Sequence, residues 1–284
     1  ILANADRLGD LLEATTDVSG RERPACGELR EGIVLEELRM RSRLGGEKRR
    51  WFGPVDLKIG AGEKIAVIGG PGVGKSTLLS VLAGRESYKG SARWDGVEIR
   101  DVDPDVLGGQ LAYVSQVPNW PYLELSDIAG GAGNGELGVL ACALLKHGGF
   151  RMLRARLKTP GGARILPEEV SHSERKVLAL IRSGLSGHSL KLIDDPVGEV
   201  TSGRSARKVL AAFLEVQDAE QTVVVALDRP VGLKRFDRVV VLKKKGRVAF
   251  DGSPVEWKAW RMTQAEPEIP VSGEPQPDQE EVSS

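Results

Sequence analysis

Residues 69–77 read Gly-Gly-Pro-Gly-Val-Gly-Lys-Ser-Thr and match the pattern G-x-x-x-x-G-K-[ST] at every position. The glycines let the backbone turn tightly and bring its N–H groups close to phosphate oxygens. Lys75 can span the β- and γ-phosphates of a nucleotide, and the Ser76 hydroxyl can bind Mg²⁺. The apolar run Lys64–Ile68 before the loop is typical of a buried strand, and residues 78–83 after it are typical of an apolar helix.

This loop is therefore expected between a strand and a helix N-terminus, where the helix dipole favours an anion. A glycine-rich turn that binds nothing is the alternative, and the Gly-Lys-Ser-Thr ending together with both flanks argues against it. The sequence predicts binding of a nucleoside triphosphate with Mg²⁺. The residues expected to contact the nucleotide are Gly69, Gly70, Pro71, Gly72, Val73, Gly74, Lys75, Ser76 and Thr77.

Composition narrows the remaining classes of function. Lysine plus arginine and aspartate plus glutamate number 40 each, so net charge gives no argument for binding nucleic acid. Aromatic residues make up only 5% of the chain, which weakens that interpretation further. Cys26 and Cys142 fit no metal-ligand spacing and favour a reducing compartment without a structural metal. No apolar stretch approaches the roughly 20 residues that span a bilayer, so the chain as given is expected to be soluble.

Strand-like and helix-like runs alternate after the loop. This alternation predicts a parallel sheet with helices on both faces. The stretch 122–170 breaks the rhythm, and we expect a helical subdomain over about 122–186. The predicted strands are 110–115, 189–194, 221–227 and 238–243, and the predicted helices are 173–186 and 203–218.

The two ends of the chain differ from its middle. Residues 1–13 have apolar side chains at helical spacing, and residues 14–30 are polar and predict a linker. A basic run over 39–50 surrounds Gly45-Gly46 and favours a solvated hairpin over a binding patch. From about residue 264 the chain is acidic and rich in proline, which predicts a disordered tail over 264–284. The first residue is Ile1, which suggests a fragment of a longer protein.

A phosphate loop needs a carboxylate that reaches Mg²⁺ directly or through water, usually at the end of a neighbouring apolar strand. Leu190–Ile193 followed by Asp194 and Asp195 supplies one. Successive strand residues point to opposite sides, so the two aspartates need not share a role. A solvated strand end is the alternative, but the intact loop upstream favours a metal-associated role for Asp194.

Over about residues 31–262 the chain resembles the nucleotide-binding domain of ATP-binding cassette (ABC) transporters. Residues 69–77 match the Walker A loop, Gln116 lies at the Q-loop position, and Asp194 matches the Walker B aspartate. The resemblance assigns Gln116 to sensing the metal and the γ-phosphate, so that Ser76, Gln116 and Asp194 would serve Mg²⁺. The runs 236–242 and 246–252 look like the closing strands of the family, and residues 5–13 are similar to the segment that leaves the last membrane helix in type I secretion exporters.

This resemblance implies an α/β fold of the P-loop NTPase (RecA-like) type. The parallel-sheet core would carry an antiparallel β subdomain and the helical subdomain. Residues 1–30 would connect to an upstream membrane domain, and 31–263 would form the nucleotide-binding domain. The implied partners are ATP, a second nucleotide-binding domain (an identical or a different chain) and the transmembrane domain of the same transporter, with no nucleic acid. The implied location is the cytoplasmic face of the inner or plasma membrane.

Several motifs depart from the family pattern. The signature LSGGQ aligns with Val170-Ser-His-Ser-Glu174, where only Ser171 is retained as a residue that would contact the phosphate bound by the partner. The catalytic glutamate is replaced by Asp195, whose side chain is shorter by about 1.3–1.5 Å. The switch histidine is replaced by Asp228. The D-loop consensus SALD matches at no position of 198–201, and the adenine-stacking aromatic is missing at its usual offset, with Trp51 a possible substitute or an ordinary core or surface residue.

Taken together, the intact loop predicts ATP binding. Asp195, Gln116 and Asp228 are the candidate catalytic residues, and turnover is expected to be impaired because Asp195 and Asp228 depart from the family pattern. The leading hypothesis is the ATP-binding domain of an ABC exporter that couples binding, and slow hydrolysis, to transport. The alternative is a regulatory or scaffolding module that binds nucleotide without hydrolysing it. A small-molecule P-loop kinase is a third hypothesis, but it does not account for Gln116 followed by the segment 170–182.

Overall fold

The computed structural model describes residue 24 and residues 26–41, 51–118, 138–157, 170–198 and 203–264. The helix predicted over 1–13, most of the linker predicted over 14–30, the turn of the basic hairpin and the tail from residue 265 lie outside the described residues. Within the described part of the chain, no helix is long and apolar enough to cross a membrane.

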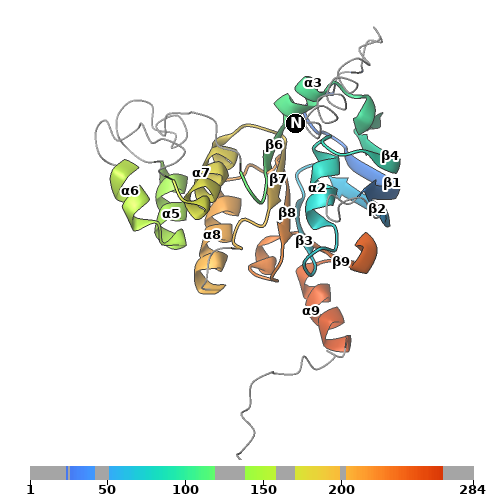
Figure 1. Ribbon diagram of the computed structural model, residues 1–284. Coiled ribbons are helices and arrows are strands. Elements are labelled where there is room, and N and C mark those ends of the chain that lie inside the picture. The colour runs from blue at the N-terminus through green and yellow to red at the C-terminus, as the bar shows by residue number, and fades with distance from the viewer. Residues whose placement is uncertain are drawn as a thin grey trace, which may run out of the picture.

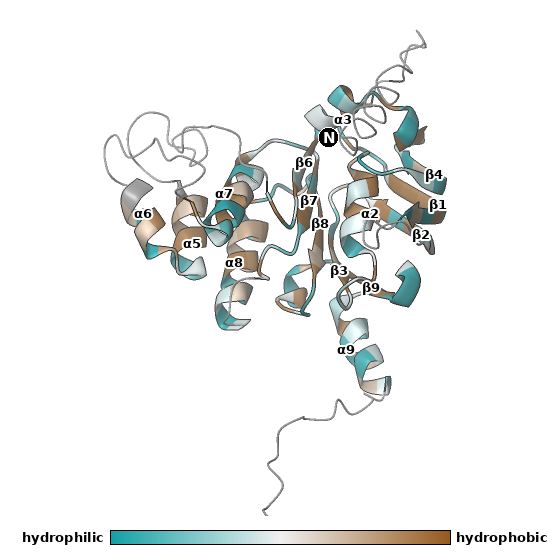
Figure 2. Cartoon of the chain, viewed as in Figure 1, coloured by the Kyte–Doolittle hydropathy of each residue, from teal (hydrophilic) through white to brown (hydrophobic). Residues whose placement is uncertain are grey.

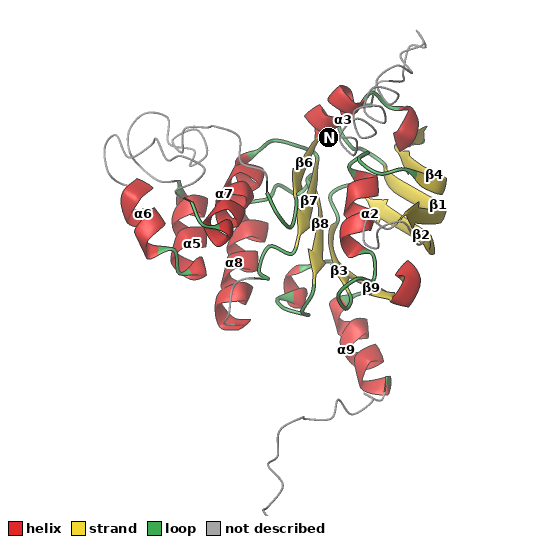
Figure 3. Cartoon of the chain, in the orientation of Figure 1, coloured by secondary structure: helices red, strands yellow, loops and turns green. Residues whose placement is uncertain are grey.

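A six-stranded sheet forms the centre of the domain, in the order β10-β9-β3-β8-β7-β6 (Figures 1 and 3). Its members run parallel to one another except β10, which is antiparallel to β9 at one edge. Most of these strands are continuous apolar runs, as a sheet covered on both faces requires. The strands are β3 (Lys64–Ile68), β6 (Leu111–Val114), β7 (Leu190–Asp194), β8 (Thr222–Leu227), β9 (Arg238–Lys243) and β10 (Arg247–Gly252).

Alternate residues of each central strand serve two separate hydrophobic cores. On β3, Ile65 and Val67 face one core, whereas Ala66 and Ile68 face the other. The first core contains α2, and the second contains α5, α7 and α8; Figure 1 shows these helices on opposite sides of the sheet. Figure 2 shows apolar residues concentrated on the strands between them. The helices are α2 (Lys75–Leu82), α5 (Val139–Gly148), α6 (Arg151–Leu157), α7 (His172–Leu185) and α8 (Gly203–Glu215).

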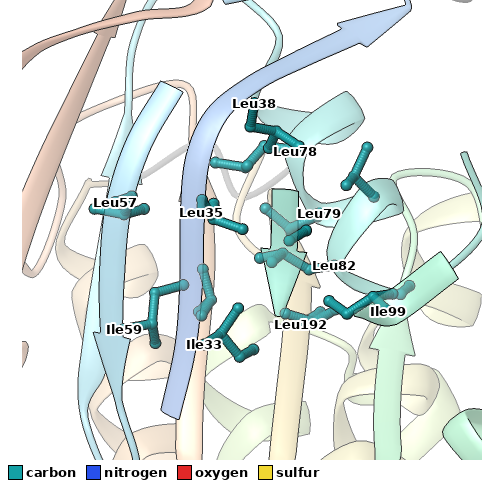
Figure 4. Packing of buried hydrophobic residues seen from close by; sticks show 14 of the residues in the cluster. Ile33, Leu35, Leu38, Leu57, Ile59, Leu78, Leu79, Leu82, Ile99 and Leu192 are labelled. Atoms are coloured by element: carbon teal, nitrogen blue, oxygen red, sulfur yellow. The ribbon is translucent and has the colours of Figure 1, made fainter. Parts of the chain in front are cut away.

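A second, antiparallel sheet covers the outer side of α2 in the order β2-β1-β4-β5. Ile33, Leu35 and Leu38 of β1 lie in the same buried cluster as the leucines of α2 (Figure 4). This packing fixes the helix that follows the phosphate loop between two sheets, so the loop is anchored at both ends. The strands are β1 (Gly32–Arg41), β2 (Trp51–Gly60), β4 (Tyr88–Trp94) and β5 (Val97–Glu98).

Two short helices, α3 (Pro104–Gln110) and α9 (Pro254–Thr263), have no counterpart among the predicted elements. Each begins with proline after a capping side chain, Asp103 in α3 and Ser253 in α9. Ser253 and Glu256 form a reciprocal capping box, so the S-x-x-E pattern together with the proline is the sequence signal for this helix.

The packed part of the domain begins before residue 31. Cys26 and Leu29 are buried in the first core, and the backbone N–H of Leu29 donates to Ser189 Oγ over 3.0 Å. Burial raises the pKa of the Cys26 thiol. This end of the predicted linker is therefore part of the folded unit, because its two apolar side chains contribute to the core.

Candidate nucleotide-binding site

Three neighbouring strands bring their carboxyl ends together at one edge of the central sheet. In the parallel register, Ile68 of β3 lies opposite Leu227 of β8, and Ala226 of β8 lies opposite Asp194 of β7. The residues that follow, Gly69 and Asp228 among them, therefore emerge side by side. The carboxyl edge of a parallel sheet is where α/β proteins bind their ligands.

The glycine-rich loop joins β3 to α2 at this edge. Gly74, the N-cap of α2, has φ of 108°, a left-handed conformation that favours glycine. A side chain at Gly69 would lie 2.5 Å from the carbonyl oxygen of Leu242. No side chain caps the N-terminus of α2, and its first turn contains no acidic residue. This helix end is therefore suited to an external anion.

Lys75, the first residue of α2, turns back into the loop. Its ammonium group donates to the carbonyl oxygens of Gly69 and Gly70 over 2.8 and 2.9 Å, and its Nζ lies 2.7 Å from Oδ1 of Asp228. The lysine side chain is 5% exposed. Lys75 therefore lies within the glycine-rich loop, in contact with the aspartate that follows β8.

Asp194 and Ser76 make the part of the site that would serve a metal. Burial raises the pKa of the Asp194 carboxyl, and a hydrogen bond with Ser76 and the charges of Lys176 and Lys75 act in the opposite direction. Among the described residues, no group of three or more His, Cys, Asp or Glu could hold a metal ion by itself. A hydroxyl and a carboxylate are hard oxygen donors that fit Mg²⁺, which commonly takes its other ligands from substrate phosphates and water. Bound there, Mg²⁺ would neutralise phosphate charge.

Asp195 has an unusual backbone for an aspartate, with φ of 45°. Its N–H donates to the carbonyl oxygen of Ala226 over 3.0 Å, which extends the pairing of β7 by one residue. A side chain at Gly198 would lie 1.8 Å from Asp195 Oδ2, so the carboxylate rests against the Gly198 backbone. Burial raises the pKa of Asp195; the Lys176 and Arg229 charges oppose this, and the Asp228 and Asp194 charges add to it.

An open cleft of about 510 Å³ connects most of the predicted site residues. Gln116, after β6, contributes an exposed side chain to its wall. Phe52 and Tyr113 are the aromatic residues among those that line the cleft, and the ring of Phe52 packs against Gly74. Trp51 does not line the cleft; it is 44% exposed, with Lys89 over its ring. The predicted residues that line the cleft are Pro71, Gly72, Gly74, Lys75, Ser76, Thr77, Gln116, Asp194, Asp195 and Asp228.

Phe52 and Lys176 are two of the residues in this region that were not predicted as site residues. Phe52 and Trp51 are adjacent on β2 and therefore point to opposite faces of the strand. This alternation is the sequence signal that could have indicated Phe52. Lys176 of α7 is buried, and its charge acts on both Asp194 and Asp195. A lysine five residues after the aligned signature serine gave no local signal, because only the packing of α7 against the sheet brings it near the aspartates.

Ser171 lies at the N-terminus of α7 and does not line the cleft. Its hydroxyl donates to Glu174 Oε2 over 2.7 Å, its N–H donates to the same oxygen over 2.9 Å, and its Oγ accepts from the N–H of Glu174. The side chain of Glu174 therefore folds back onto Ser171 as a capping box. The serine predicted to meet a phosphate on a partner is thus bonded to a carboxylate of its own helix.

The fold and the site define a P-loop nucleotide-binding domain: a glycine-rich loop between a buried strand and a helix, with a lysine, a serine and a neighbouring aspartate. A model of the ABC transporter family matches residues 52–198, just over half of the chain. The chain belongs to this family. The predicted α/β fold class, with an antiparallel β subdomain beside the parallel sheet, is confirmed.

Individual relatives agree with this assignment. CydD of Escherichia coli, a glutathione/L-cysteine transport system ATP-binding/permease protein, is 29% identical over 228 residues, which cover 79% of this chain and 37% of CydD. The macrolide export ATP-binding/permease protein MacB of Hahella chejuensis is 28% identical over 197 residues, covering 66% of this chain and 29% of MacB. The chain thus spans little more than a third of these relatives at most.

A solved structure of a bacterial Atm1-family ABC exporter with ATP bound is similar to this one with a TM-score of 0.67. The match covers 94% of this chain and 48% of that chain at 20% sequence identity. At this identity the likeness shows a shared fold. It therefore supports the arrangement of the two sheets and leaves the chemistry to the residues themselves.

Proposed function

We propose that this domain binds Mg-ATP tightly, hydrolyses it slowly, and couples the binding to transport through a membrane domain. The observation that carries the proposal is the convergence of Lys75, Ser76 and Asp194 on one cleft at the carboxyl edge of the sheet. These groups have the chemistry to hold phosphates and Mg²⁺. The remaining loop residues and Gln116 complete the proposed binding set.

The proposal of slow hydrolysis rests on three altered positions. Asp195 is the candidate base, and its shorter side chain rests against Gly198. Asp228 places a carboxylate on the phosphate-binding lysine, where the family has a histidine. Ser171 is engaged by Glu174. A displacement of a catalytic group by about 1 Å can lower a rate by on the order of 100-fold.

The proposed partners follow from the family and from the names of the relatives. CydD and MacB are ATP-binding/permease proteins, and the solved relative is an exporter. We infer that this domain pairs with a second nucleotide-binding domain, identical or different, and with a transmembrane domain of the same transporter, on the cytoplasmic face of the inner or plasma membrane. A better-equipped partner would supply an intact signature to the Lys75 site.

Equilibrium titration with Mg-ATP tests the binding half of the proposal. The chain should bind Mg-ATP, and Lys75→Ala should weaken binding by roughly 100-fold or more, because both phosphates lose their cation. Lys64→Ala removes a lysine from the start of β3, remote from the loop, and should leave the affinity within about threefold. Absence of binding to the unmodified chain, or equal binding by Lys75→Ala, would contradict the proposal.

The hydrolysis half is tested by restoring the family residues. Asp195→Glu combined with Asp228→His should raise the steady-state ATPase rate at saturating Mg-ATP if the geometry at these positions limits turnover. Asp195→Asn combined with Asp228→His is the matched control, because it carries no carboxylate at the candidate base. An unchanged ATPase rate in the restored variant would contradict this explanation and would indicate that the α7 end of the site limits turnover.

The second candidate function is a regulatory or scaffolding module that binds nucleotide without hydrolysing it. The carboxylates placed on Lys75 and Ser171 favour it, since both lie where phosphate would bind in the family. The two functions differ in the full-length protein: a transporter changes its ATPase rate when its cargo is present in a membrane. A protein with ATP binding and no turnover under any cargo or lipid condition would favour the second function.

A further inference from the structure

The ammonium group of Lys75 has three N–H donors, and the chain itself offers three acceptors. Two are the carbonyl oxygens of Gly69 and Gly70, and the third is the carboxylate of Asp228 at 2.7 Å. With only 5% of the lysine side chain exposed, water has little access to replace them. A phosphate oxygen can therefore bind Lys75 only where one of these three acceptors leaves.

The three acceptors are not equivalent. The two carbonyls are neutral and belong to the backbone of the loop, whereas Asp228 carries a full charge and follows the end of β8. Charge-assisted hydrogen bonds are about twice as strong as neutral ones, so Asp228 is the strongest competitor for the lysine. Its side chain is 41% exposed, which gives it room to swing towards solvent when it is displaced.

Resting on the ATP site proposed above, we propose that Asp228 sets the preference of this site between a nucleoside diphosphate and a nucleoside triphosphate. In a phosphate loop the lysine reaches both the β- and the γ-phosphate. Lys75 can bind the β-phosphate in exchange for a loop carbonyl and keep Asp228 as its other charged partner. The terminal phosphate of a triphosphate has to take the place of Asp228.

A displaced Asp228 adds to the negative charge of the cleft. Asp194 and Asp195 line the same cleft, and the charge of Asp228 already acts on both. The terminal phosphate thus meets a carboxylate that it has just displaced, and like charges at close range disfavour the complex. The triphosphate gains less from Lys75 than it would in a chain without this carboxylate, and the diphosphate is nearly unaffected.

The test compares calorimetric titrations of the 284-residue chain with Mg-ADP and Mg-ATP. Asp228→Asn keeps the shape and removes the charge, and should tighten Mg-ATP binding about tenfold and Mg-ADP binding less than about threefold. Glu220→Gln is the control, because it removes an exposed carboxylate that does not line the cleft; it should change the ratio of the two dissociation constants less than about twofold. Asp228→Ser repeats the measurement with a smaller side chain and should shift the ratio in the same direction.

The outcomes separate this inference from the proposed function. If the unmodified chain binds neither nucleotide, the proposed function fails. If it binds both and Asp228→Asn changes both affinities equally, or weakens Mg-ATP binding, the inference fails and the ATP site stands. An equal change of the ratio in Glu220→Gln would also overturn the inference, because the net charge of the chain, and not the contact of Asp228 with Lys75, would then set the preference.

Discussion

Two helices of this domain, α2 and α7, begin at positions where the family binds phosphate, and they treat that anion differently. α2 starts from Gly74, with no side-chain cap and no acidic residue in its first turn. α7 starts from Ser171, whose hydroxyl and N–H are both bonded to Glu174. The positive end of the α2 dipole can therefore interact with an external anion, whereas the N-terminus of α7 already has the Glu174 carboxylate beside it.

The carboxylates of the chain are placed differently at these two helix ends. On the α7 side, Glu174 stabilises the helix at the position where the family would use a partner's phosphate. On the α2 side, the helix end is open and the carboxylate of Asp228 is placed on Lys75 instead. Under the proposed function, binding and stability are thus assigned to different helix ends: the uncapped end of α2 would bind the ligand, and Glu174 caps α7.

The largest expected effect comes from giving α2 the carboxylate that α7 has. Thr77 occupies the position in α2 that Glu174 occupies in α7, three residues after the N-cap. Thr77→Glu should weaken Mg-ATP binding by at least about 100-fold, because a carboxylate would lie beside the bound phosphates. Thr77→Gln has the same length without the charge and should weaken binding by less than about tenfold. Equal losses in titrations of the two variants would show that bulk, and not charge, closes the site.

A smaller effect is expected from removing the carboxylate of Asp195, which follows β7 and lines the cleft at the N-terminus of α2. Burial raises the pKa of Asp195, so the folded state binds protons more tightly than the unfolded state and loses stability as the pH rises through the folded pKa. Asp195→Asn should therefore unfold at higher denaturant concentration than the unmodified chain at pH 7. The difference should shrink as the pH falls and vanish below the unfolded pKa of about 3.9. A variant that is less stable at pH 7 would refute this account of the buried charge.

The smallest effects are expected at the α7 end, and they have the opposite sign. Ser171→Ala should lower the free energy of unfolding by about 1 kcal/mol, because it removes the N-cap. Glu174→Gln should lower it by only about 0.3–1 kcal/mol, since glutamine can keep the capping box but not the charge at the helix N-terminus. Both are measured by urea unfolding at neutral pH. Mg-ATP affinity of the same variants should stay within about twofold of the unmodified chain, and a larger change would mean that α7 contributes to the Lys75 site of its own chain.

Much of the central sheet could be predicted because each strand carries its own signal. Three of the strands are short apolar runs bounded by polar or glycine residues: β3 (Lys64–Ile68), β7 (Leu190–Asp194) and β9 (Arg238–Lys243). The antiparallel sheet was expected only from the family resemblance, because the sequence alternation in β1 and β2 is weak and their pairing has two register shifts. The short helices α3 and α9 were missed although their capping residues precede a proline in each case.

The candidate site was predictable in its membership and not in its contacts. Lys75, Ser76 and Asp194 follow from the loop pattern and from an apolar strand ending in aspartate. Phe52, which follows Trp51 on β2, lines the cleft because adjacent strand residues point to opposite faces. The direction of Glu174 was open in the sequence, and the structure turns it back onto Ser171.

By itself the sequence determined the phosphate loop and the elements on either side of it, because glycine conformation, helix start signals and apolar runs are local properties of the chain. Only the tertiary structure decided that Asp228 would hold Lys75. That contact depends on β8 lying between β3 and β7 in the sheet, so that residues remote in sequence leave its carboxyl edge side by side. Strand order arises from packing on both faces of the sheet, and no local pattern encodes it.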